Sequence, residues 1–382
     1  MLCYHAGMEN KALVENEWQY VLNMMPPDLE ESAAAKLALR RRREIASAAD
    51  LLRLALAYGV CDMSLRQTAA WAELIGLGRL SDVAVLKRLK AADEWLGHLI
   101  LRWLQQRGLP TRVPPVPVRI VDASVICQPG STGTDWRLHL GLDLASQRIS
   151  TVELTGPQGG ETLLRHAIEP GQIILGDRAY GQRGGAASVL EAGGHVVLRI
   201  SWQNFPLQGR SGGPLDLVTC AEILKPGEIG DWEVQFEHEG QRYPMRLVVL
   251  RKSQAAAQKE QERIRKAASR KKRRIDKRSL RAAKFTYVIT DLPKQQLPTA
   301  EVLELYRLRW QIEITFKRLK GILHFDHLRA RDSELARSYL YAKILGALIM
   351  DEMSNEALSF FPWGYPLFRQ AGEHLASPTD SI

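Results

Sequence analysis

Three acidic residues stand where they could hold a divalent cation. Asp122 lies inside the apolar stretch VRIVDASVI, and Asp177 ends the stretch QIILGD. A carboxylate in an apolar strand is costly unless a cation compensates its charge, and open α/β sheets bind ligands at the carboxyl ends of their strands. Glu313 supplies a third carboxylate, in ELYRLRWQIEITFKRLKGIL. Carboxylates are hard oxygen ligands that suit Mg²⁺ or Mn²⁺, and a pair of such ions can support phosphodiester cleavage.

Glu313 is the most informative of these residues, because the two aspartates, each taken alone, also fit structural roles such as capping a helix. Four polar side chains recur along the predicted helix at offsets of 0, 3, 7 and 14, namely Tyr306, Arg309, Glu313 and Lys320. At about 100° per residue they fall within about 60° of one another. A solvated face with an Arg309–Glu313 ion pair accounts for two of them but not for the tyrosine and the lysine. The stripe therefore indicates a helix face with a function.

The spacing Y-x2-R-x3-E-x6-K, from Tyr306 to Lys320, resembles the helix signature of the insertion-sequence-four group of DDE transposases. Asp122 in VDAS resembles the first catalytic carboxylate of that family, and DRAYG at 177–181 resembles the motif around its second. The order of the three acidic residues, with a long β-rich segment before the third, also matches. The resemblance covers about 118–320 and extends loosely into the flanking helices.

This resemblance implies an enzyme that cleaves DNA at transposon ends and joins the freed 3′ ends to target DNA. It implies that Asp122, Asp177 and Glu313 bind Mg²⁺ or Mn²⁺, with two ions expected. The expected partner is double-stranded DNA, bound by a homodimer with one copy per transposon end, and the family cuts the second strand through a hairpin. Two rivals stay open: an RNase H-like nuclease that cuts without joining, and a catalytically inactive DNA-binding relative.

The companions of the acidic residues are predicted to bind DNA. Tyr306, Arg309 and Lys320 would hold phosphates of the cleaved end, because guanidinium groups bind phosphate bidentately and lysine acts as a point charge. Arg178, next to the second aspartate, could do the same. Trp202, where the insertion begins, could stack on a base flipped out of the DNA end, and a buried core position is at least as well supported.

The elements that must position these residues are predicted as an α/β fold with an RNase H-like mixed sheet core. Five stretches have strand character, at 118–126, 136–144, 148–155, 172–177 and 195–200. Three strands in a meander, followed by alternating helix and strand, is the order of that core. We expect the first section of the catalytic core at 111–200, a β-rich insertion at 201–284, and the second section of the core at 285–330, with a long helix over about 299–323.

Helices are predicted on both sides of this core. Residues 1–110 are expected to form a helical, DNA-binding domain, and 331–382 a C-terminal helical segment that could support dimerisation. Ser64 and Ser81 are predicted N-caps of two helices joined by a glycine turn. This arrangement resembles a helix-turn-helix, although many such hairpins bind nothing.

Basic residues of this N-terminal region are predicted on helices. Four consecutive arginines, 40–43, fall in a stretch with helical character from about 30 to 59. The second member of the helical hairpin carries Lys87, Arg88 and Lys90.

A second basic segment lies in the insertion. Between Lys259 and Lys284 there are thirteen Lys and Arg residues against three Asp and Glu. Such a run can be a solvated helix face, a flexible loop or a DNA-backbone clamp. Its place inside an expected DNA enzyme favours phosphate contact, with the densest cluster at Lys271, Lys272, Arg273 and Arg274.

Composition agrees with an anionic partner and does not define it. The 382 residues carry 52 Lys and Arg against 43 Asp and Glu, a formal net charge of +9, which suits nucleic acid as well as a merely basic enzyme. Four scattered cysteines indicate neither a zinc ribbon nor a disulfide framework. With neither a signal peptide nor a membrane-spanning stretch expected, the predicted location is the bacterial cytoplasm, in association with the nucleoid.

Overall fold

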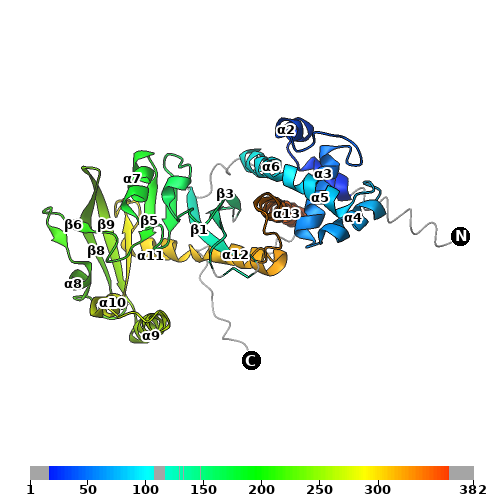
Figure 1. Ribbon diagram of the computed structural model, residues 1–382. Coiled ribbons are helices and arrows are strands. Elements are labelled where there is room, and N and C mark those ends of the chain that lie inside the picture. The colour runs from blue at the N-terminus through cyan, green and yellow to red at the C-terminus, as the bar shows by residue number, and fades with distance from the viewer. Residues whose placement is uncertain (1–16, 107–116, 129, 132, 147, 361–382) are drawn as a thin grey trace, which may run out of the picture.

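A computed structural model describes residues 17–106, 117–128, 130–131, 133–146 and 148–360. The predicted entry to the core at 111–116 and the last stretch of the predicted C-terminal segment, 361–382, lie outside these residues. Figure 1 shows two lobes, one built on a β-sheet and one made of helices.

The sheet lobe contains a single mixed sheet in the order β3-β2-β1-β4-β5-β10-β9-β8-β6-β7. Its first half consists of β3 (Ile149–Thr155), β2 (Trp136–Asp143), β1 (Val118–Ile126), β4 (Ile173–Gly176) and β5 (His195–Arg199). Strand β1 pairs antiparallel with β2 and parallel with β4, which pairs parallel with β5. This meander followed by parallel strands confirms the predicted RNase H-like α/β class.

The insertion extends the same sheet. After it, β10 (Phe285–Thr290) returns beside β5 in antiparallel pairing. Beyond β10 lie the strands of the insertion, β9 (Gln241–Arg251), β8 (Ile229–His238), β6 (Leu207–Gly209) and β7 (Pro214–Leu215). Its helices are α8 (Leu217–Ala221), α9 (Gln254–Arg270) and α10 (Lys277–Ala282). The basic segment is therefore carried by helices anchored to the sheet (Figure 1).

Alternation along β1 decides which face receives the first aspartate. Ile120 and Ile126 belong to the core that includes helix α12 (Trp310–Leu323), whereas Val121 belongs to the core that includes α7 (Arg183–Glu191). Successive side chains of a strand point to opposite faces. Asp122, two residues after Ile120, therefore faces α12.

The long helix predicted over 299–323 is two helices. Helix α11 (Thr299–Arg307) ends before Leu308, and α12 begins at Trp310. Around the break the backbone N–H groups of Leu308 and Arg309 bond to carbonyls three residues back, at 3.1 Å each. Such 3₁₀-type turns tighten the helix. The four polar residues of the predicted stripe therefore do not share one continuous helix.

The helical lobe combines the two ends of the chain. It consists of α2 (Leu29–Ala35), α3 (Ala48–Val60), α4 (Leu65–Leu74), α5 (Asp82–Ala91), α6 (Asp93–Gln106) and α13 (Ser333–Phe360). Helix α13 packs against α3, α5 and α6. Ser64 and Ser81 cap α4 and α5 as predicted, each side chain accepting a backbone N–H. Among the described helices none is long and apolar enough to span a bilayer.

One prediction about basic residues of this lobe is wrong. Residues 40–43 lie in the irregular segment between α2 and α3 rather than on a helix. Lys90 lies on α5 as predicted, and it forms ion pairs with Asp332 (2.8 Å) and Glu334 (3.1 Å) at the start of α13. Pattern alone could not reveal a partner 242 residues away.

Candidate active site

Asp122 and Glu313 are joined through one arginine. A guanidinium nitrogen of Arg309 lies 3.7 Å from Asp122 Oδ2, and another donates to Glu313 Oε1 at 2.6 Å. The side chains of Arg309 and Asp122 are each 17% exposed. The break between α11 and α12 places Arg309 at the N-cap position of α12, over the strand that carries Asp122. The Arg309–Glu313 ion pair of a solvated helix face is present, but the same arginine also reaches the buried Asp122.

Asp177 follows β4 and shapes the turn after it. Its Oδ1 accepts the backbone N–H of Ala179 at 2.8 Å. The N-cap of the following helix α7 is Gln182, so Asp177 is not a helix cap. Strands β1 and β4 are parallel neighbours, and the charge of Asp177 acts on the Asp122 carboxyl. The parallel register, with Ile120 opposite Leu175, puts Asp122 and Asp177 at corresponding positions of the two neighbouring chain segments.

Burial and neighbouring charges disfavour the ionised form of Asp122. The pKa of the Asp122 carboxyl is raised to about 6, mainly by burial and also by the negative charges of Asp177 and Glu161. The N–H of Ala123 and the guanidinium of Arg309 act in the opposite direction. A buried carboxylate with acidic neighbours is stabilised in its charged form by a bound cation.

The carboxylates of the three predicted ligands, Asp122, Asp177 and Glu313, do not converge on one point in the structure. Among the described residues no group of three or more His, Cys, Asp or Glu side chains is close enough to hold a metal ion. Asp122 and Asp177 face one region, while Glu313 is drawn to Arg309. The donors that are present are carboxylate oxygens, which fit a hard divalent cation.

Tyr306 and Lys320, the other two members of the predicted polar stripe, differ in how close they lie to Arg309 and Glu313. Tyr306, at the end of α11, is half-buried, and its ring lies 5.9 Å from the guanidinium carbon of Arg309. The charges of Arg199, Arg309 and Asp177 all act on its hydroxyl. Lys320 lies half-buried in the last turn of α12, almost two turns beyond Glu313.

Arg178 and Trp202 line one pocket, which the sequence did not predict. The pocket is about 240 Å³ in volume, and Arg199 and Lys252 add positive charge to its lining. The guanidinium carbon of Arg278 lies 4.9 Å from the centre of the Trp202 ring, and Trp202 is partly exposed. Trp202 therefore lies at the edge of the core, and its ring is in contact with the guanidinium of Arg278.

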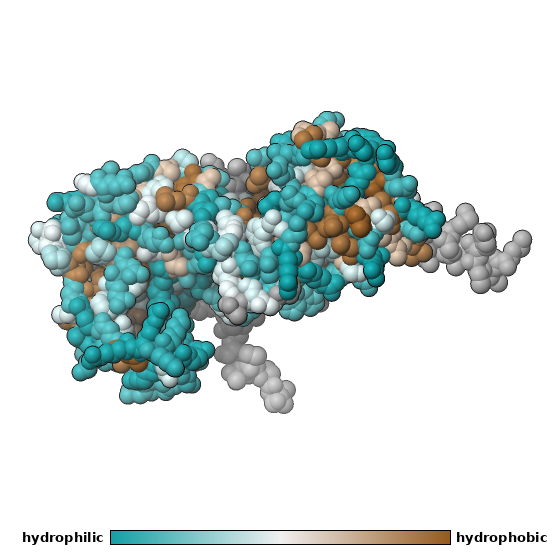
Figure 2. Space-filling view, viewed as in Figure 1, coloured by the Kyte–Doolittle hydropathy of each residue, from teal (hydrophilic) through white to brown (hydrophobic). Residues whose placement is uncertain are grey.

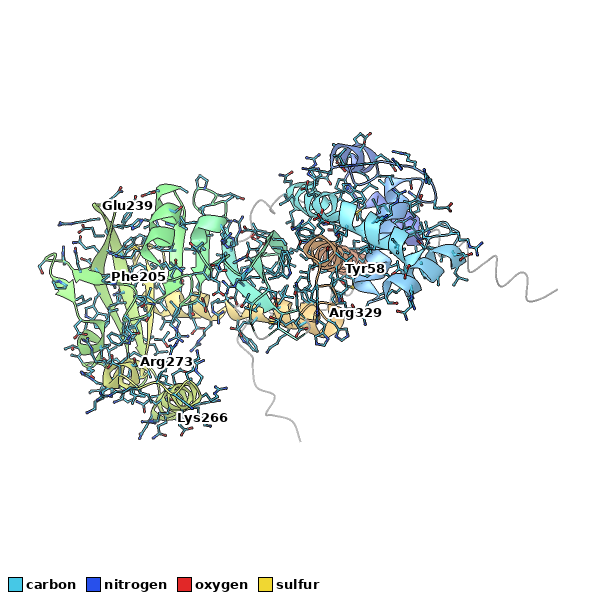
Figure 3. The ribbon with its side chains drawn as sticks, viewed as in Figure 1. Tyr58, Phe205, Glu239, Lys266, Arg273 and Arg329 are labelled. Atoms are coloured by element: carbon cyan, nitrogen blue, oxygen red, sulfur yellow. The ribbon has the colours of Figure 1, made fainter. Side chains whose placement is uncertain are left out.

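The basic cluster at 271–274 is an exposed turn between α9 and α10. Lys272 adopts a left-handed conformation there, with φ of 48°. Figure 3 labels Arg273 and Lys266 at the lower side of the sheet lobe, and the surface over α9 and α10 is strongly hydrophilic in Figure 2. The cluster is placed where a long anionic ligand could reach it.

Fold and site together define a class of protein. The protein combines an RNase H-like sheet, two aspartates on neighbouring segments, a glutamate on a helix and a basic surface. This combination is typical of enzymes that break phosphodiester bonds of nucleic acid. Residues 115–350 match the family described as "Transposase DDE domain". The chain belongs to this family of DNA-cutting and strand-transferring enzymes, which depend on divalent metal.

Relatives agree with this assignment. The chain is 35% identical to InsL of insertion sequence element IS186A from Escherichia coli strain K12 over 356 residues, covering 91% of this chain and 96% of the relative. It is 35% identical over 357 residues, with the same coverage, to the transposase for insertion sequence element IS421 of Escherichia coli. A transposase for insertion sequence element IS231F of Bacillus thuringiensis subsp. israelensis is 30% identical over 135 residues, 35% of this chain and 28% of the relative. The nuclease and inactive-relative alternatives are not favoured by these matches.

Proposed function

We propose that this DDE transposase cuts the ends of its own insertion sequence and joins them to target DNA with Mg²⁺ or Mn²⁺ held by Asp122, Asp177 and Glu313. The observation that carries the proposal is the Arg309 bridge, because one guanidinium links the buried aspartate of β1 to the glutamate of α12. A short shift of Glu313 away from Arg309 would bring the third carboxylate to the two aspartates.

Each side chain then has a defined task. Two ions, when bound, would activate the attacking oxygen and stabilise the leaving oxygen. Arg309, released from Glu313, would bind a phosphate of the DNA end through its planar fork. The Tyr306 hydroxyl, on which the charge of Arg309 acts, would donate to a phosphate oxygen. Lys320 would contact the DNA backbone further along α12.

The pocket at Arg178 and Trp202 is proposed to receive the terminal nucleotides. Arg178, Arg199 and Lys252 give it a positive lining for phosphate, and Trp202 and Tyr287 offer aromatic rings on which a base can stack. The finer family features are proposals as well: membership of the insertion-sequence-four group, a homodimer in the DNA complex, a hairpin intermediate, and a place at the bacterial nucleoid.

Replacement of Glu313 by Gln tests the carboxylate set. The amide keeps the shape of the side chain but removes the charge that binds a cation, so strand cleavage of DNA carrying the element's ends should be lost while binding of those ends is retained. Glu304→Gln is the matched control, because Glu304 is exposed on α11 and pairs with neighbouring Arg307. Cleavage by Glu313→Gln at the wild-type rate would refute this assignment.

A second assay separates joining from cutting. Pre-cleaved ends with free 3′-hydroxyls, supplied with Mg²⁺ and supercoiled target DNA, should be inserted into the target by the wild-type chain. Cutting without any joined product under these conditions would point to a nuclease instead.

A further inference from the structure

A basic hollow of about 750 Å³ lies in the helical lobe, on elements that carry none of the acidic residues of the candidate active site. Its walls are the irregular segment between α2 and α3, the turn between α4 and α5, and one side of α5. Six cations and one carboxylate line it: Arg40, Arg41, Arg43, Arg79, Lys87, Arg88 and Glu44. Such an excess of positive charge around one concavity favours a ligand that carries several negative charges.

The arginine segment at 40–44 is held in a fixed position on the rest of the lobe. Glu44 Oε2 accepts the backbone N–H of Arg79 at 3.1 Å, which ties the segment to the turn before α5. In that turn Gly78 passes so close that an added Cβ would lie 2.8 Å from the carbonyl oxygen of Glu44. Arg88 of α5 donates to the carbonyl of Arg41 at 2.6 Å. The cations of three separate segments are therefore presented to the same hollow.

Most of the cations in this hollow have no carboxylate partner. Within the described part of the chain, no ion pair involves four of them: Arg40, Arg41, Arg43 and Lys87. Their neighbour Arg42, which does not line the hollow, pairs with Glu30 at 2.9 Å. Burial and the nearby charge of Arg43 lower the pKa of Arg88. Like charges gathered in this way are stabilised by an anion that binds among them.

The outer face of α5 offers little for reading bases. Val83, Lys87 and Ala91 are exposed there at intervals of four residues, and only Lys87 among them can hydrogen-bond to a base edge. At the start of the helix, Ser81 is engaged as the N-cap and Asp82 in an ion pair. A recognition helix needs several polar side chains on such a face. The lobe is better suited to phosphates, which position DNA but carry no sequence information.

We propose that this hollow binds the phosphate backbone of double-stranded DNA regardless of sequence, with Arg40, Arg43 and Lys87 as the main contacts. Guanidinium groups grip phosphates bidentately, and lysine adds a point charge. The ends of the element and the target DNA would be held alike, because both present the same backbone. The inference rests on DNA as the substrate in the proposed function, but it does not depend on the metal site.

Binding of the full-length chain to duplex DNA, measured with chelator present at several salt concentrations, tests this inference. Two duplexes of equal length are compared, one carrying the end of the element and one a scrambled sequence. Replacing Arg40, Arg43 and Lys87 together by Gln should lower the slope of log affinity against log salt by about 2 to 3 for both duplexes. Arg42→Gln is the matched control, because it removes a positive charge from the same segment but outside the hollow. It should leave the slope unchanged.

The possible outcomes are distinct. An unchanged slope in the triple variant would overturn the inference. A loss confined to the duplex with the element's end would also overturn it, because the hollow would then read sequence. Equal losses per charge in the triple variant and in Arg42→Gln would show that net charge acts, rather than the hollow. A wild-type chain that bound neither duplex would refute the proposed function together with the inference.

Lysine acetylation of the wild-type chain covers the case in which the triple variant does not fold. Read by mass spectrometry, acetylation of Lys87 should be slowed by the scrambled duplex. Lys36 is the internal control, since it is exposed on the same lobe and lines a different groove. Acetylation of Lys87 at the same rate with and without DNA would contradict the proposal.

Discussion

At the scale of single residues, Asp122 shows how the fold prepares a carboxylate for a cation. The side chain is forced onto a covered face by the alternation of β1, and burial is the largest cause of its raised pKa. The fold therefore disfavours the charged form of Asp122, the form that metal binding needs. In the proposed metal site a bound cation would relieve this electrostatic cost.

This cost predicts a pH-dependent effect of Asp122→Asn. The pKa of Asp122 rises from 3.8 to about 6 on folding, so its contribution to stability is lost as the pH increases from about 4 through about 6. With chelator present at about pH 7, Asp122→Asn should be more stable to urea than wild type by up to about 3 kcal/mol, and the difference should vanish near pH 4. The exposed Asp326→Asn is the control. An equal difference at both pH values would contradict the argument.

At the scale of elements, α12 is fixed at its far end by one buried lysine. Lys343 of α13 is 0% exposed. Its ammonium donates to the carbonyls of Leu323 and His324, at the end of α12, and pairs with Asp62 at 2.9 Å. Tyr339 also bonds to Asp62. The helix that carries Glu313 is thereby joined to the helical lobe, where Figure 3 shows Arg329 near Tyr58.

Lys343→Met should therefore destabilise the protein substantially. The change leaves Asp62 and two carbonyls at the helix end without their cationic partner, which costs about 3 kcal/mol or more in comparable buried pairs. Urea unfolding should show this loss, whereas Lys259→Met, on the exposed surface of α9, should change stability by about 0.5 kcal/mol or less. A small effect of Lys343→Met would mean that α12 is anchored by apolar packing alone.

At the scale of the whole molecule, two basic regions stand out in addition to the pocket lined by Arg178, Arg199 and Lys252. One is the turn at 271–274. The other is a hollow of about 750 Å³ in the helical lobe, whose charged lining is Arg40, Arg41, Arg43, Glu44, Arg79, Lys87 and Arg88. The two regions belong to different lobes, so a DNA duplex that contacted both would span the two lobes.

Neutralising the turn should change the salt dependence of DNA binding. Each phosphate contact adds about 0.9 to the slope of log affinity against log salt. Replacing Lys271, Lys272, Arg273 and Arg274 by Gln should lower that slope by about 2 to 4 and weaken end binding. Lys225→Gln, an exposed lysine in a loop of the insertion, should leave the slope unchanged. An unchanged slope in the quadruple variant would show that the turn is a solvated surface.

Much of the architecture follows from local pattern. The five core strands lie within one residue of their expected bounds, because period-two alternation and turn residues act over a few positions. Ser64 and Ser81 cap their helices because capping depends only on residues three positions away. The acidic residues at 122, 177 and 313, and the family to which the chain belongs, were likewise evident from sequence.

Tertiary structure decided what those residues do to one another. The break at Leu308, the reach of Arg309 to Asp122, and the pairing of Lys90 with Asp332 all depend on how separate elements meet. Sequence periodicity reports which face a side chain takes on its own element. Distances between elements depend on how whole layers pack, and no local pattern encodes them.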